Sequence, residues 1–494
     1  MTKDRLRRAT LDHLPASVAR PAYDRTALKQ GIVHLGLGAF FRAHGAAYTD
    51  SVLATGDTRW GIVGVSLVRP DQRDRLKPQD GLYTLVERDG DTPRARVVGS
   101  VLDVLVAPES PAAVIDRLAH PDTHVVSLTI TEKGYCHNPA TGHLDVAHPN
   151  IVHDLASPHA PKSAIGYLVA GLARRRTANL KPFTVLCCDN LPHNGRLVRG
   201  LVNEFARRFE PALADWIEAH GAFPSTMVDR IVPAATPADL DDALRLTGLH
   251  DAAPVSHEPF AQWVIEDQFV DGLRPAWEAH GAEIVSDVAP FENMKLRLLN
   301  GAHSALAYLG YLGGHETIGA CVADPVYRRY VERLWRDEIV PATPAPPGVD
   351  LATYAGRLLD RFANPAIRHR TWQIAMDGSQ KLPQRLLATA RLRIDRDLPI
   401  DGLALAIAAW IRYVGGRDEH GAPIDVRDPL AGQFAKIIAD AGPDPSRVAT
   451  AILGVAAVFP PALSANIRFS SAVANAYDAI VAHGSRAAIA AHIG

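Results

Sequence analysis

The feature that most constrains the fold is an alternation between two kinds of sequence that persists to about residue 290. Short runs rich in β-branched residues are typical of strands, and the segments between them, such as 111–120 and 163–176, repeat apolar residues every three or four positions, as helices do. The strand-like runs are GIVHLG (31–36), GIVGVSL (61–67), LYTLVER (82–88), ARVVGSVLDVLV (95–106), HVVSLTITE (124–132), FTVLCCDN (183–190) and AEIVSDVAPF (282–291). This alternation predicts an α/β fold with a largely parallel sheet covered by helices.

Beyond residue 291 the strand-like runs disappear, and helical patterns follow one another between proline and glycine breaks. These patterns cover 291–313, 324–340, 350–363, 401–414, 428–440, 446–458 and 471–492. A chain of 494 residues exceeds the length at which a single hydrophobic core stops growing. We therefore predict two domains, an α/β domain at 1–290 and a mainly α-helical domain at 291–494.

Charge and cysteine content limit the classes of partner. The 52 Lys and Arg residues nearly balance the 54 Asp and Glu residues, which gives no attraction to nucleic acid or to an anionic membrane. The four cysteines lack zinc-site spacing, and the N-terminal segment lacks the apolar core of a signal peptide. We expect a cytoplasmic protein with a small-molecule partner and with neither a nucleic-acid nor a membrane partner.

Histidines gather between residues 137 and 159 and raise the question of a metal site. They occupy a stretch rich in Pro, Asn and Gly, without the helical i,i+4 pairing or the accompanying ligands of known metal motifs. We predict no metal there.

A glycine turn, Gly36 and Gly38, follows the first strand-like run. In dinucleotide-binding folds a first glycine allows the tight turn, and a second lets the backbone approach a pyrophosphate at a helix N-terminus. Phe41 stands where the usual third glycine would be, so the motif alone is equally compatible with a purely structural turn. The other residues expected to contact a cofactor here are Ala39, Phe40 and Arg42.

Two acidic residues extend the candidate cofactor site. Asp71 follows the second strand-like run, where a carboxylate would bind the ribose hydroxyls of NAD, although the nearby Arg69 would favour the 2′-phosphate of NADP. Glu132 follows a later strand end and is either near the nicotinamide or a cap of the following turn. We expect NAD in preference to NADP.

Three polar side chains share the helical pattern FENMKLRLLNGAHSALAYLG at 291–310. On a regular α-helix, Asn300 lies about 140° and His303 about 80° round from Lys295, so one broad face carries all three. A desolvated lysine can act as general base toward a secondary alcohol, and an asparagine amide can donate to an oxygen that gains negative charge. The histidine can bind substrate. Structural roles for the three side chains are the alternative.

Further polar residues stand at predicted strand ends. Asn190 lies just past the apolar part of FTVLCCDN, at the edge where open α/β sheets bind ligands, and is a candidate second donor to the same oxygen. Asp229 in MVDRIVP is another active-site candidate, with an ion pair to Arg230 as the structural alternative.

Together these residues resemble the polyol-specific long-chain dehydrogenase/reductase family over nearly the whole chain. The matching motifs occur in the family's order: GIVHLGLGAFFRAH (31–44), SLTITEKGYC (127–136), FTVLCCDNLPHNG (183–195), FPSTMVDRIVP (223–233), EPFAQWVIEDQF (258–269) and MKLRLLNGAHSALAYLG (294–310). An ordered set is far more specific than one glycine turn, and it favours the dinucleotide interpretation of that turn.

The resemblance implies a Rossmann-type N-terminal domain, a mainly helical C-terminal domain and metal-independent hydride transfer between NAD(P) and a polyol or sugar acid. The family motif K....N..H matches Lys295, Asn300 and His303, which implies a general base, an oxyanion-stabilising amide and a substrate-orienting imidazole. Asn190 matches the family's other oxyanion-hole asparagine. Glu292 matches a glutamate associated with proton passage to solvent.

The segment HRTWQIAMDGSQKLPQR (369–385) bears on the substrate. Gln373 stands where the mannitol 2-dehydrogenase branch has a substrate-contacting arginine, and the segment is more similar to the D-mannonate oxidoreductase (fructuronate reductase) branch. Lys381 and Arg385 are candidates for binding a substrate carboxylate, with a solvated basic face or a pair with Asp377 as the alternative. We expect interconversion of D-mannonate and D-fructuronate, and D-mannitol and D-fructose are the alternative, because the first half of the chain is similar to mannitol 2-dehydrogenases.

Two rival functions belong to other classes. A noncatalytic dinucleotide-binding sensor would have no need of the base at Lys295. A hydroxyacid dehydrogenase of another two-domain type can also pair a lysine with an asparagine, but its motif order would differ.

Overall fold

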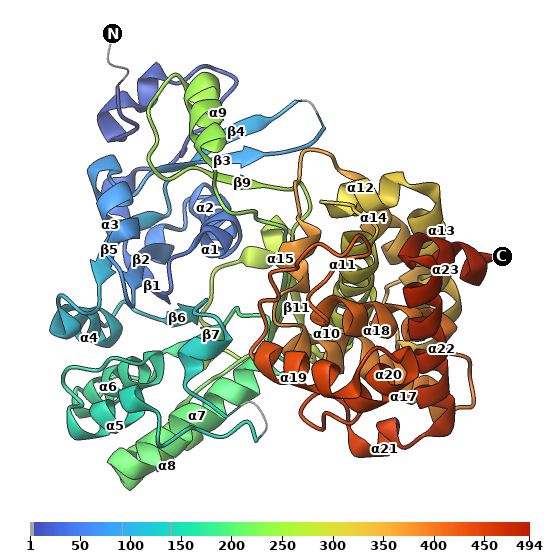
Figure 1. The fold of residues 1–494 in the computed structure, drawn as a ribbon. Coiled ribbons are helices and arrows are strands. Elements are labelled where there is room, and N and C mark those ends of the chain that lie inside the picture. Colours follow the sequence, from blue (N-terminus) through green and yellow to red (C-terminus); the bar gives the residue numbers. More distant parts are fainter. Residues whose placement is uncertain (1–3, 91, 139–140) are drawn as a thin grey trace. The chain divides into compact units, whose positions relative to one another are not determined.

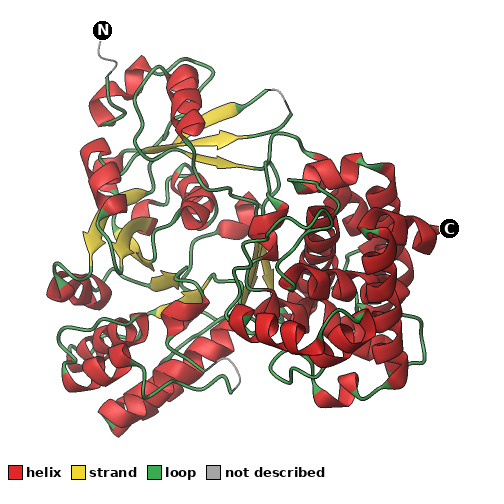
Figure 2. Ribbon diagram, in the orientation of Figure 1, coloured by secondary structure: helices red, strands yellow, loops and turns green. Residues whose placement is uncertain are grey.

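The computed structural model describes residues 4–90, 92–138 and 141–494, and the chain divides into two compact units, Met1–Val288 and Ala289–Gly494. The first unit combines sheets with helices, and the second consists of helices (Figure 1, Figure 2). The sequence places the boundary two residues later, after residue 290.

A five-stranded parallel sheet in the order β5-β2-β1-β6-β7 forms the centre of the first unit. Its strands are β1 (Gln30–Leu35), β2 (Gly61–Ser66), β5 (Val101–Val106), β6 (Val125–Leu128) and β7 (Thr184–Cys187). The strand order reverses between β1 and β6, and open α/β sheets bind ligands outside the carboxyl ends of the strands at such a point. The predicted parallel α/β sheet of Rossmann type is confirmed.

Helices cover both faces of this sheet because its strands are apolar on both sides. Val33 and Leu35 of β1 belong to one buried cluster with residues of α4, α6 and α7, whereas Ile32 points to the opposite face and joins a cluster with residues of α1 and α2. The helices of this unit are α1 (Ala39–Ala43), α2 (Gly45–Leu53), α3 (Asp71–Leu76), α4 (Pro111–Ala119), α5 (Pro149–Ala156), α6 (Ala164–Thr177), α7 (Asn194–Phe209), α8 (Pro211–His220) and α9 (Pro237–Thr247).

Two three-stranded sheets accompany the parallel one, and they correct the sequence-based assignment. The run 95–106 is two strands, because the chain turns at Gly99 and Ser100; β4 pairs antiparallel with β3, and β5 joins the parallel sheet. The run 282–291 is a strand only at its start. The added strands are β3 (Tyr83–Glu87), β4 (Arg94–Val98), β8 (Thr226–Asp229), β9 (Val255–His257), β10 (Gln262–Glu266) and β11 (Glu283–Val285).

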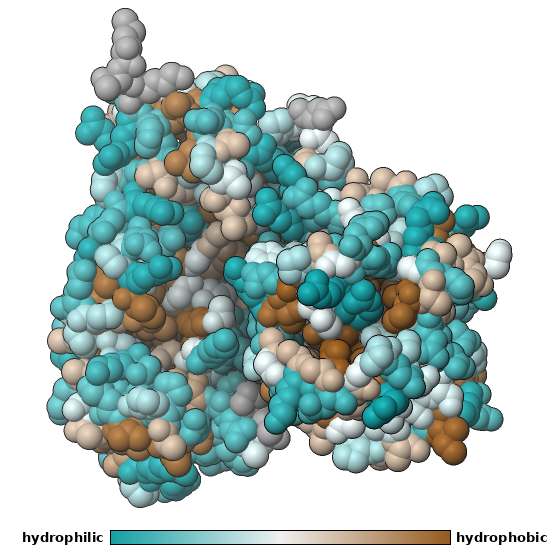
Figure 3. All heavy atoms as spheres, viewed as in Figure 1, coloured by the Kyte–Doolittle hydropathy of each residue, from teal (hydrophilic) through white to brown (hydrophobic). Residues whose placement is uncertain are grey.

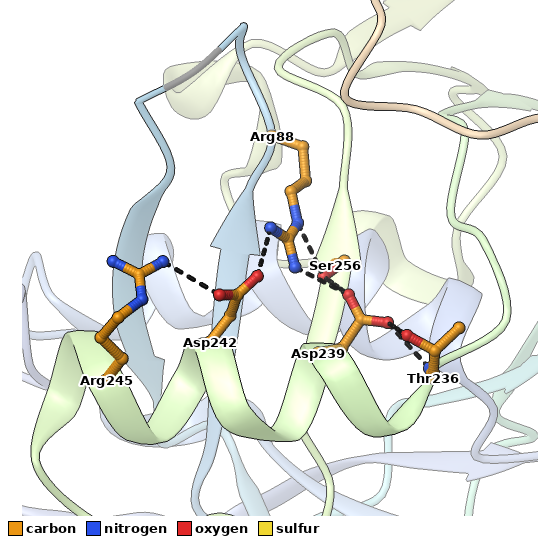
Figure 4. Close-up of polar contacts among 6 residues, drawn as sticks. All are labelled: Arg88, Thr236, Asp239, Asp242, Arg245 and Ser256. Atoms are coloured by element: carbon orange, nitrogen blue, oxygen red, sulfur yellow. Dashed lines mark hydrogen bonds and ion pairs between the residues drawn. The ribbon is translucent and has the colours of Figure 1, made fainter.

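An ion-pair cluster ties α9 to the sheet β4-β3-β9 (Figure 4). The guanidinium of Arg88 donates to Asp239 at 2.8 Å, to Asp242 at 2.6 Å and to the hydroxyl of Ser256 at 3.2 Å. Asp239 also accepts from both the backbone N–H and the hydroxyl of Thr236, which caps α9. The donors of Arg88 are thus used within the chain.

The second unit is a helical domain, as predicted, arranged around α18. This helix is apolar and buried over almost its whole circumference, which is typical of a helix enclosed by others, and it packs against α11 and α22. The helices are α10 (Ala289–Met294), α11 (Ala302–Leu312), α12 (Ile318–Ala323), α13 (Pro325–Arg333), α14 (Leu351–Ala363), α15 (Thr371–Ala375), α16 (Gly378–Leu382), α17 (Ala388–Ile394), α18 (Asp401–Val414), α19 (Ala431–Ala441), α20 (Pro445–Leu453), α21 (Pro461–Ser464), α22 (Ile467–His483) and α23 (Ser485–Ile493).

Three π-helical segments, Lys295–Gly301, Leu334–Ile339 and Pro383–Leu387, continue α10, α13 and α16. The predicted single helix 471–492 is instead two helices, since Gly484 adopts a φ of +81° between α22 and α23.

The visible surface of both units is mainly polar, with apolar residues in small groups (Figure 3). None of the helices in the described part of the chain combines the length and the apolar character needed to cross a membrane.

Candidate active site

The two glycines of the turn after β1 differ in what surrounds them. Gly36 has a φ of +92°, and a Cβ there would collide with the carbonyl oxygen of Thr129. At Gly38, a Cβ would meet only the Gly36 oxygen, at 3.8 Å, so its outer side is open. The first turn of α1 follows directly, without a side-chain cap. The turn therefore presents backbone to a ligand, as a phosphate-binding turn does.

A cavity of about 430 Å³ lies at the carboxyl ends of β1, β2 and β6. Its position at the strand-order reversal and its size suit part of a dinucleotide. Val68 on its wall is 78% exposed, an unusual state for a valine that a ligand ring would cover. The predicted residues that line this cavity are Gly36, Gly38 and Asp71.

Phe41 replaces the third glycine without separating helix from sheet. Its ring stacks on the buried imidazole of His34 on β1, with centroids 3.3 Å apart and planes 4° from parallel. Burial lowers the pKa of His34 to about 3, so the ring stays neutral. Gly64 on β2 leaves room for the side chain of Leu37. Close packing beside the turn therefore depends on Gly64 and does not need a glycine at position 41.

Arg42 differs from its expected role. Its side chain is 4% exposed, donates to the carbonyl oxygen of Ala253 and lies over the ring of Tyr83, because α1 turns this residue into the core. Its guanidinium therefore does not face the cavity. Ala39 and Phe40 begin α1 and are half-buried, and Phe40 stacks on His44 at 5.1 Å.

The acidic candidate Asp71 is the first residue of α3 and lines the cavity wall together with Arg69. The two side chains form an exposed ion pair at 3.4 Å. The sequence therefore identified both members of this pair. Glu132 starts a short 3₁₀ turn next to the wall residue Thr131 and is half-buried.

Thr131 has an unusual backbone, with φ +64° and ψ 160°. This region is almost restricted to glycine and costs about 1–3 kcal/mol for other residues. Asp189 accepts hydrogen bonds from the backbone N–H groups of Ile130 and Thr131, at 2.7 and 3.2 Å. No sequence pattern indicates this strained position.

Two further candidates follow other strands of the first unit. Asn190 is exposed just beyond β7, as expected for a residue at the ligand-binding edge. Asp229 ends β8 and is 4% exposed, and its neighbour Arg230 donates to backbone oxygens, including that of Ala43.

In the second unit, α10, a π-helical segment and α11 form one continuous helix that carries four predicted residues. Glu292, Lys295, Asn300 and His303 are 8%, 7%, 8% and 6% exposed. Charged and polar side chains are this strongly buried only where partners or function require it.

The helix is not a regular α-helix, and this corrects the angles expected from the sequence. Residues Lys295–Gly301 are π-helical. In such a turn, hydrogen bonds join residues five apart, so residues five apart lie nearly one above the other. Lys295 and Asn300 are therefore brought closer on one face than the α-helical spacing predicts.

A second π-helical segment packs against the first. Pro383–Leu387 contacts Lys295–Gly301, and Gly301 permits this approach, because a Cβ there would lie 2.9 Å from the carbonyl oxygen of Arg385. Arg385 in turn donates to the hydroxyl of Ser304 at 3.2 Å. The predicted carboxylate-binding residue thus lies beside the helix of Lys295.

Two buried polar atoms of this helix have no hydrogen-bond partner among the described residues. Among the described residues, none lies within hydrogen-bonding reach of Asn300 Nδ2 or His303 Nε2, although both atoms are buried. Leaving a buried polar group unpaired costs about 1–3 kcal/mol. Unpaired groups on adjacent positions of one helix face are what a site for an oxygen-rich ligand requires.

Basic side chains surround His303. Its ring stacks on Phe362 at 4.3 Å and meets His369 edge-on at 5.0 Å. Burial lowers the pKa of His303 well below its ordinary value, and nearby positive charges lower it further. Arg361, Arg385 and Lys295 supply these charges, and His369 lowers the pKa of His303 further when it is itself protonated.

The neighbouring charges also affect one another. Burial, with Lys381 and Arg385, lowers the pKa of His369 to about 4. Burial lowers the pKa of Lys381 to about 8 and that of Arg385 to about 10. The Lys381 ammonium donates to the carbonyl oxygens of Met376 and Ile374, which anchors it, and Gln373 is exposed on α15.

His369 is the site residue that sequence reasoning missed. Its Nδ1 atom is buried and unpartnered among the described residues. It begins the segment 369–385, in which the sequence points to Gln373, Lys381 and Arg385 instead. A histidine in a short loop between two helices gives no periodic signal that would identify it.

The histidine-rich stretch 137–159 is partly helical rather than a loop, since His148 caps α5 and His153 lies on it. Within the described residues, no group of three or more His, Cys, Asp or Glu side chains is arranged to hold a metal ion.

Comparison with known proteins agrees with this geometry. Residues 30–279 match the mannitol dehydrogenase Rossmann domain, and residues 287–481 match the mannitol dehydrogenase C-terminal domain. The D-mannonate oxidoreductase of Escherichia coli K12 is 48% identical over 480 residues, covering 96% of this chain and 98% of that protein. A mannitol 2-dehydrogenase of Phaeosphaeria nodorum is 42% identical over 480 residues, covering 96% and 83%.

A solved structure has the same fold over the full length. Mannitol 2-dehydrogenase of Pseudomonas fluorescens, in a ternary complex with NAD and D-mannitol, superposes with a TM-score of 0.90 at 39% identity and covers 99% of both chains. The chain therefore belongs to the mannitol dehydrogenase family and is an oxidoreductase that acts on CH–OH groups.

Proposed function

We propose that the chain is an NAD-dependent, metal-independent oxidoreductase that interconverts the secondary alcohol of a sugar acid with its ketose, most specifically D-mannonate with D-fructuronate. The observation that carries this proposal is the pair of buried polar atoms without a partner, Asn300 Nδ2 and His303 Nε2, on the helix of Lys295. They provide hydrogen bonds for a hydroxylated substrate beside a buried amine.

The three side chains divide the work of alcohol oxidation. Lys295 accepts the hydroxyl proton, and the amide of Asn300 donates to the oxygen as negative charge develops on it. His303 donates to a neighbouring substrate oxygen and fixes its orientation. A nicotinamide dinucleotide, when bound, supplies the hydride acceptor. In the direction of reduction, Lys295 returns the proton.

Three other residues keep the roles that the family resemblance implies. Glu292, three positions before Lys295 on the same helix, passes the proton to solvent. Asn190 is a second donor to the reacting oxygen, and Asp229 a substrate-binding residue.

The cofactor proposal depends on the cavity beside Gly36 and Gly38. The Asp71 carboxylate on its wall supports NAD through the ribose hydroxyls, and Arg69 reduces that preference by pairing with it. Ala39 and Phe40 follow the glycine turn at the start of α1, and Glu132 follows the wall residue Thr131. Four free, buried cysteines, at 136, 187, 188 and 321, support a reducing cytoplasmic location.

Basic surroundings favour a sugar acid over a neutral polyol. Arg361 and Arg385 place positive charge near His303, and Lys381 and Arg385 place it near the neighbouring His369. A carboxylate gains charge-assisted hydrogen bonds from such groups, whereas D-mannitol carries no charge to pair with them. Gln373 is exposed on α15.

Steady-state assays at matched concentrations test the proposal. Absorbance of reduced nicotinamide is followed with D-mannonate, D-mannitol, D-arabinitol and D-sorbitol, with NAD and with NADP, in the presence and absence of a chelator. We expect the highest kcat/KM with D-mannonate and NAD, unchanged by chelator. Loss of activity on chelation would refute metal independence.

The second candidate is a D-mannitol/D-fructose dehydrogenase, favoured by the likeness to the Pseudomonas fluorescens structure. A higher kcat/KM with D-mannitol than with D-mannonate would establish it. Dinucleotide binding without turnover of any of the four substrates would instead indicate the noncatalytic sensor.

A further inference from the structure

One carboxylate holds the part of the dinucleotide cavity that follows β6. Asp189 Oδ2 accepts from the backbone N–H of Ile130 at 2.7 Å and from the hydroxyl of Tyr135 at 2.6 Å. Its Oδ1 accepts from the backbone N–H of Thr131 at 3.2 Å. The carboxylate therefore gathers three donors from one short stretch of chain.

The conformation that these bonds hold is unfavourable by itself. Thr131 has a branched Cβ and a φ of +64°, a combination that persists only when the surroundings determine it. Ile130 and Thr131 both line the cavity. The strain is thus located at the ligand-binding surface.

Asp189 is itself well fixed. Its backbone carbonyl accepts from Asn194 Nδ2 at 2.9 Å, and Asn194 is fully buried and also bonded to Thr226. Parallel pairing of β6 with β7, in register at Leu128 and Cys187, brings the two strand ends side by side. The carboxylate can therefore transmit the position of β7 to the loop after β6.

We propose that Asp189 is a positioning residue for dinucleotide binding, which holds the Thr129–Thr131 wall of the cavity in its strained, ligand-ready conformation. This inference rests on the proposed dinucleotide-dependent function. It assigns Asp189 no direct contact with substrate or with the reacting atoms.

Asp189→Asn is the first test. The amide nitrogen of the new asparagine is a donor and cannot accept a hydrogen bond from a backbone N–H. At least one of the bonds that hold the wall is therefore lost, and the wall relaxes. We expect the Kd for NADH, measured by quenching of protein fluorescence, to rise at least tenfold, and the KM for NADH to rise more than kcat falls. An NADH affinity within twofold of the unmodified protein would overturn the proposal.

Asp251→Asn is the matched control, because Asp251 is a buried carboxylate in the same unit that also accepts from two backbone N–H groups and one side chain. The donors are Thr84 N at 2.6 Å, Ala253 N at 2.8 Å and Gln79 Nε2 at 2.8 Å. It does not line the cavity at the carboxyl ends of β1, β2 and β6. We expect Asp251→Asn to lower the Tm about as much as Asp189→Asn does. We expect its Kd for NADH to stay within twofold of that of the unmodified protein. An equal loss of NADH affinity would reduce the role of Asp189 to stability.

Rescue separates positioning from general damage. Thr131→Gly, added to Asp189→Asn, removes the Cβ that makes this φ unfavourable, so the wall regains its conformation without the full set of bonds. We expect the double variant to recover at least threefold in NADH affinity over Asp189→Asn. No recovery would show that strain at Thr131 is irrelevant.

Hydrogen exchange of the unmodified protein tests the same idea even if a variant fails to fold. Thr131 is exposed, yet its N–H and that of Ile130 are bonded to Asp189. We expect slow exchange in the peptide containing both amides before NADH is added. Fast exchange that slows only with NADH would mean that the ligand, not Asp189, sets the conformation. If the unmodified protein binds no NADH, the proposed function fails, whereas the exchange result still stands.

Discussion

Two clusters of charged and polar side chains, one in each unit, use their donors in opposite ways. Around Arg88 the guanidinium is distributed over Asp239, Asp242 and Ser256. Around His303 the positive charges of Arg361, Arg385 and Lys295 lower the pKa of the ring, and Asn300 Nδ2 and His303 Nε2 are buried with no hydrogen-bond partner in the described part of the chain.

The difference separates polar groups that stabilise the fold from polar groups that are available to bind a ligand. A buried charge with its partners in place stabilises the local fold, because removing any partner leaves an uncompensated group. A buried donor without a partner costs stability and persists where a ligand supplies the missing acceptor. Substitutions in the two clusters should therefore affect different quantities.

The largest expected effect is that of Lys295→Ala on turnover. Loss of the proton acceptor should lower kcat by about 10²–10⁴-fold, the usual contribution of general acid–base catalysis. The Kd for NADH should stay within about threefold of that of the unmodified protein, because the residues of the proposed cofactor cavity belong to the first unit and Lys295 to the second. Stopped-flow and steady-state rates with D-mannonate measure this, and unchanged kcat would remove Lys295 from its role.

Next in size is Asn300→Ala, which should lower kcat by about 10²–10³-fold through loss of a donor to the developing oxyanion. Asn203 on α7 is a matched control, because it also has a buried, unpartnered amide atom, its Oδ1. Asn203→Ala should leave kcat unchanged. Equal effects of the two substitutions would show that an unpaired amide does not mark a ligand site here.

Arg385→Met should change substrate choice rather than turnover. We expect the KM for D-mannonate to rise about 10–100-fold, as when a charge-assisted hydrogen bond to a carboxylate is lost, with the KM for D-mannitol unchanged. Arg391→Met, which breaks an exposed pair with Asp395 at 2.8 Å on the next helix, is the control. A parallel rise in KM for both substrates would contradict the carboxylate role.

Arg88→Met should reverse the pattern and reduce stability without reducing activity. Its pairs with Asp239 and Asp242 are largely shielded, with the Arg88 side chain 18% exposed, so the free energy of unfolding of the first unit should fall by about 1–3 kcal/mol. Arg245→Met, which removes only an exposed pair, should cost less than about 0.5 kcal/mol. Denaturant unfolding with parallel kcat measurements checks both.

The smallest effect concerns pH and His369. Its pKa is lowered to about 4 in the folded protein, so below the ordinary value near 6.5 the unfolded chain takes up a proton that the folded protein does not. Its contribution to stability is present above pH 6.5 and is lost as pH falls toward 4. His369→Asn should flatten the dependence of unfolding free energy on pH between 5 and 6 by about 1 kcal/mol per unit.

Glu338 acts with the opposite sign. Burial raises its pKa to about 7, and its carboxylate accepts from the N–H groups of Gly402 and Leu403 at the start of α18. Between pH 4.5 and 7 the folded protein holds a proton on Glu338 that the unfolded chain releases. The contribution of Glu338 to the free energy of unfolding is therefore fully present below pH 4.5 and is lost as pH rises through 7. Measurements of His369→Asn therefore need the unmodified protein as reference at each pH.

The sequence predicted most of the architecture because its signals are local and periodic. The apolar run of β1, the glycines at 36 and 38, and the helical repeat of α18 each determine structure over a few residues. The strands β8, β9 and β10 were missed since they are three to five residues long and pair with partners far along the chain.

The sequence predicted which residues of the candidate site are buried on one helix better than it predicted how they are arranged. Lys295, Asn300 and His303 are all buried on one continuous helix, but their spacing was calculated for an α-helix. The inward turn of Arg42, the strain at Thr131 and the approach of His369 depend on packing between segments, which no local pattern encodes.

The π-helical segment makes residue count, and not only residue identity, decide which side chains share a helix face. Replacing side chains one at a time between Lys295 and Asn300 would leave the register of the backbone intact and would not reveal it. Restoring ordinary helical hydrogen bonding with every residue kept would place Lys295 and Asn300 about 140° apart, whereas deleting one residue between them would leave them four apart and on one face. A one-residue gap in a relative at this point should therefore be compatible with dehydrogenase chemistry where the lysine, asparagine and histidine are all retained.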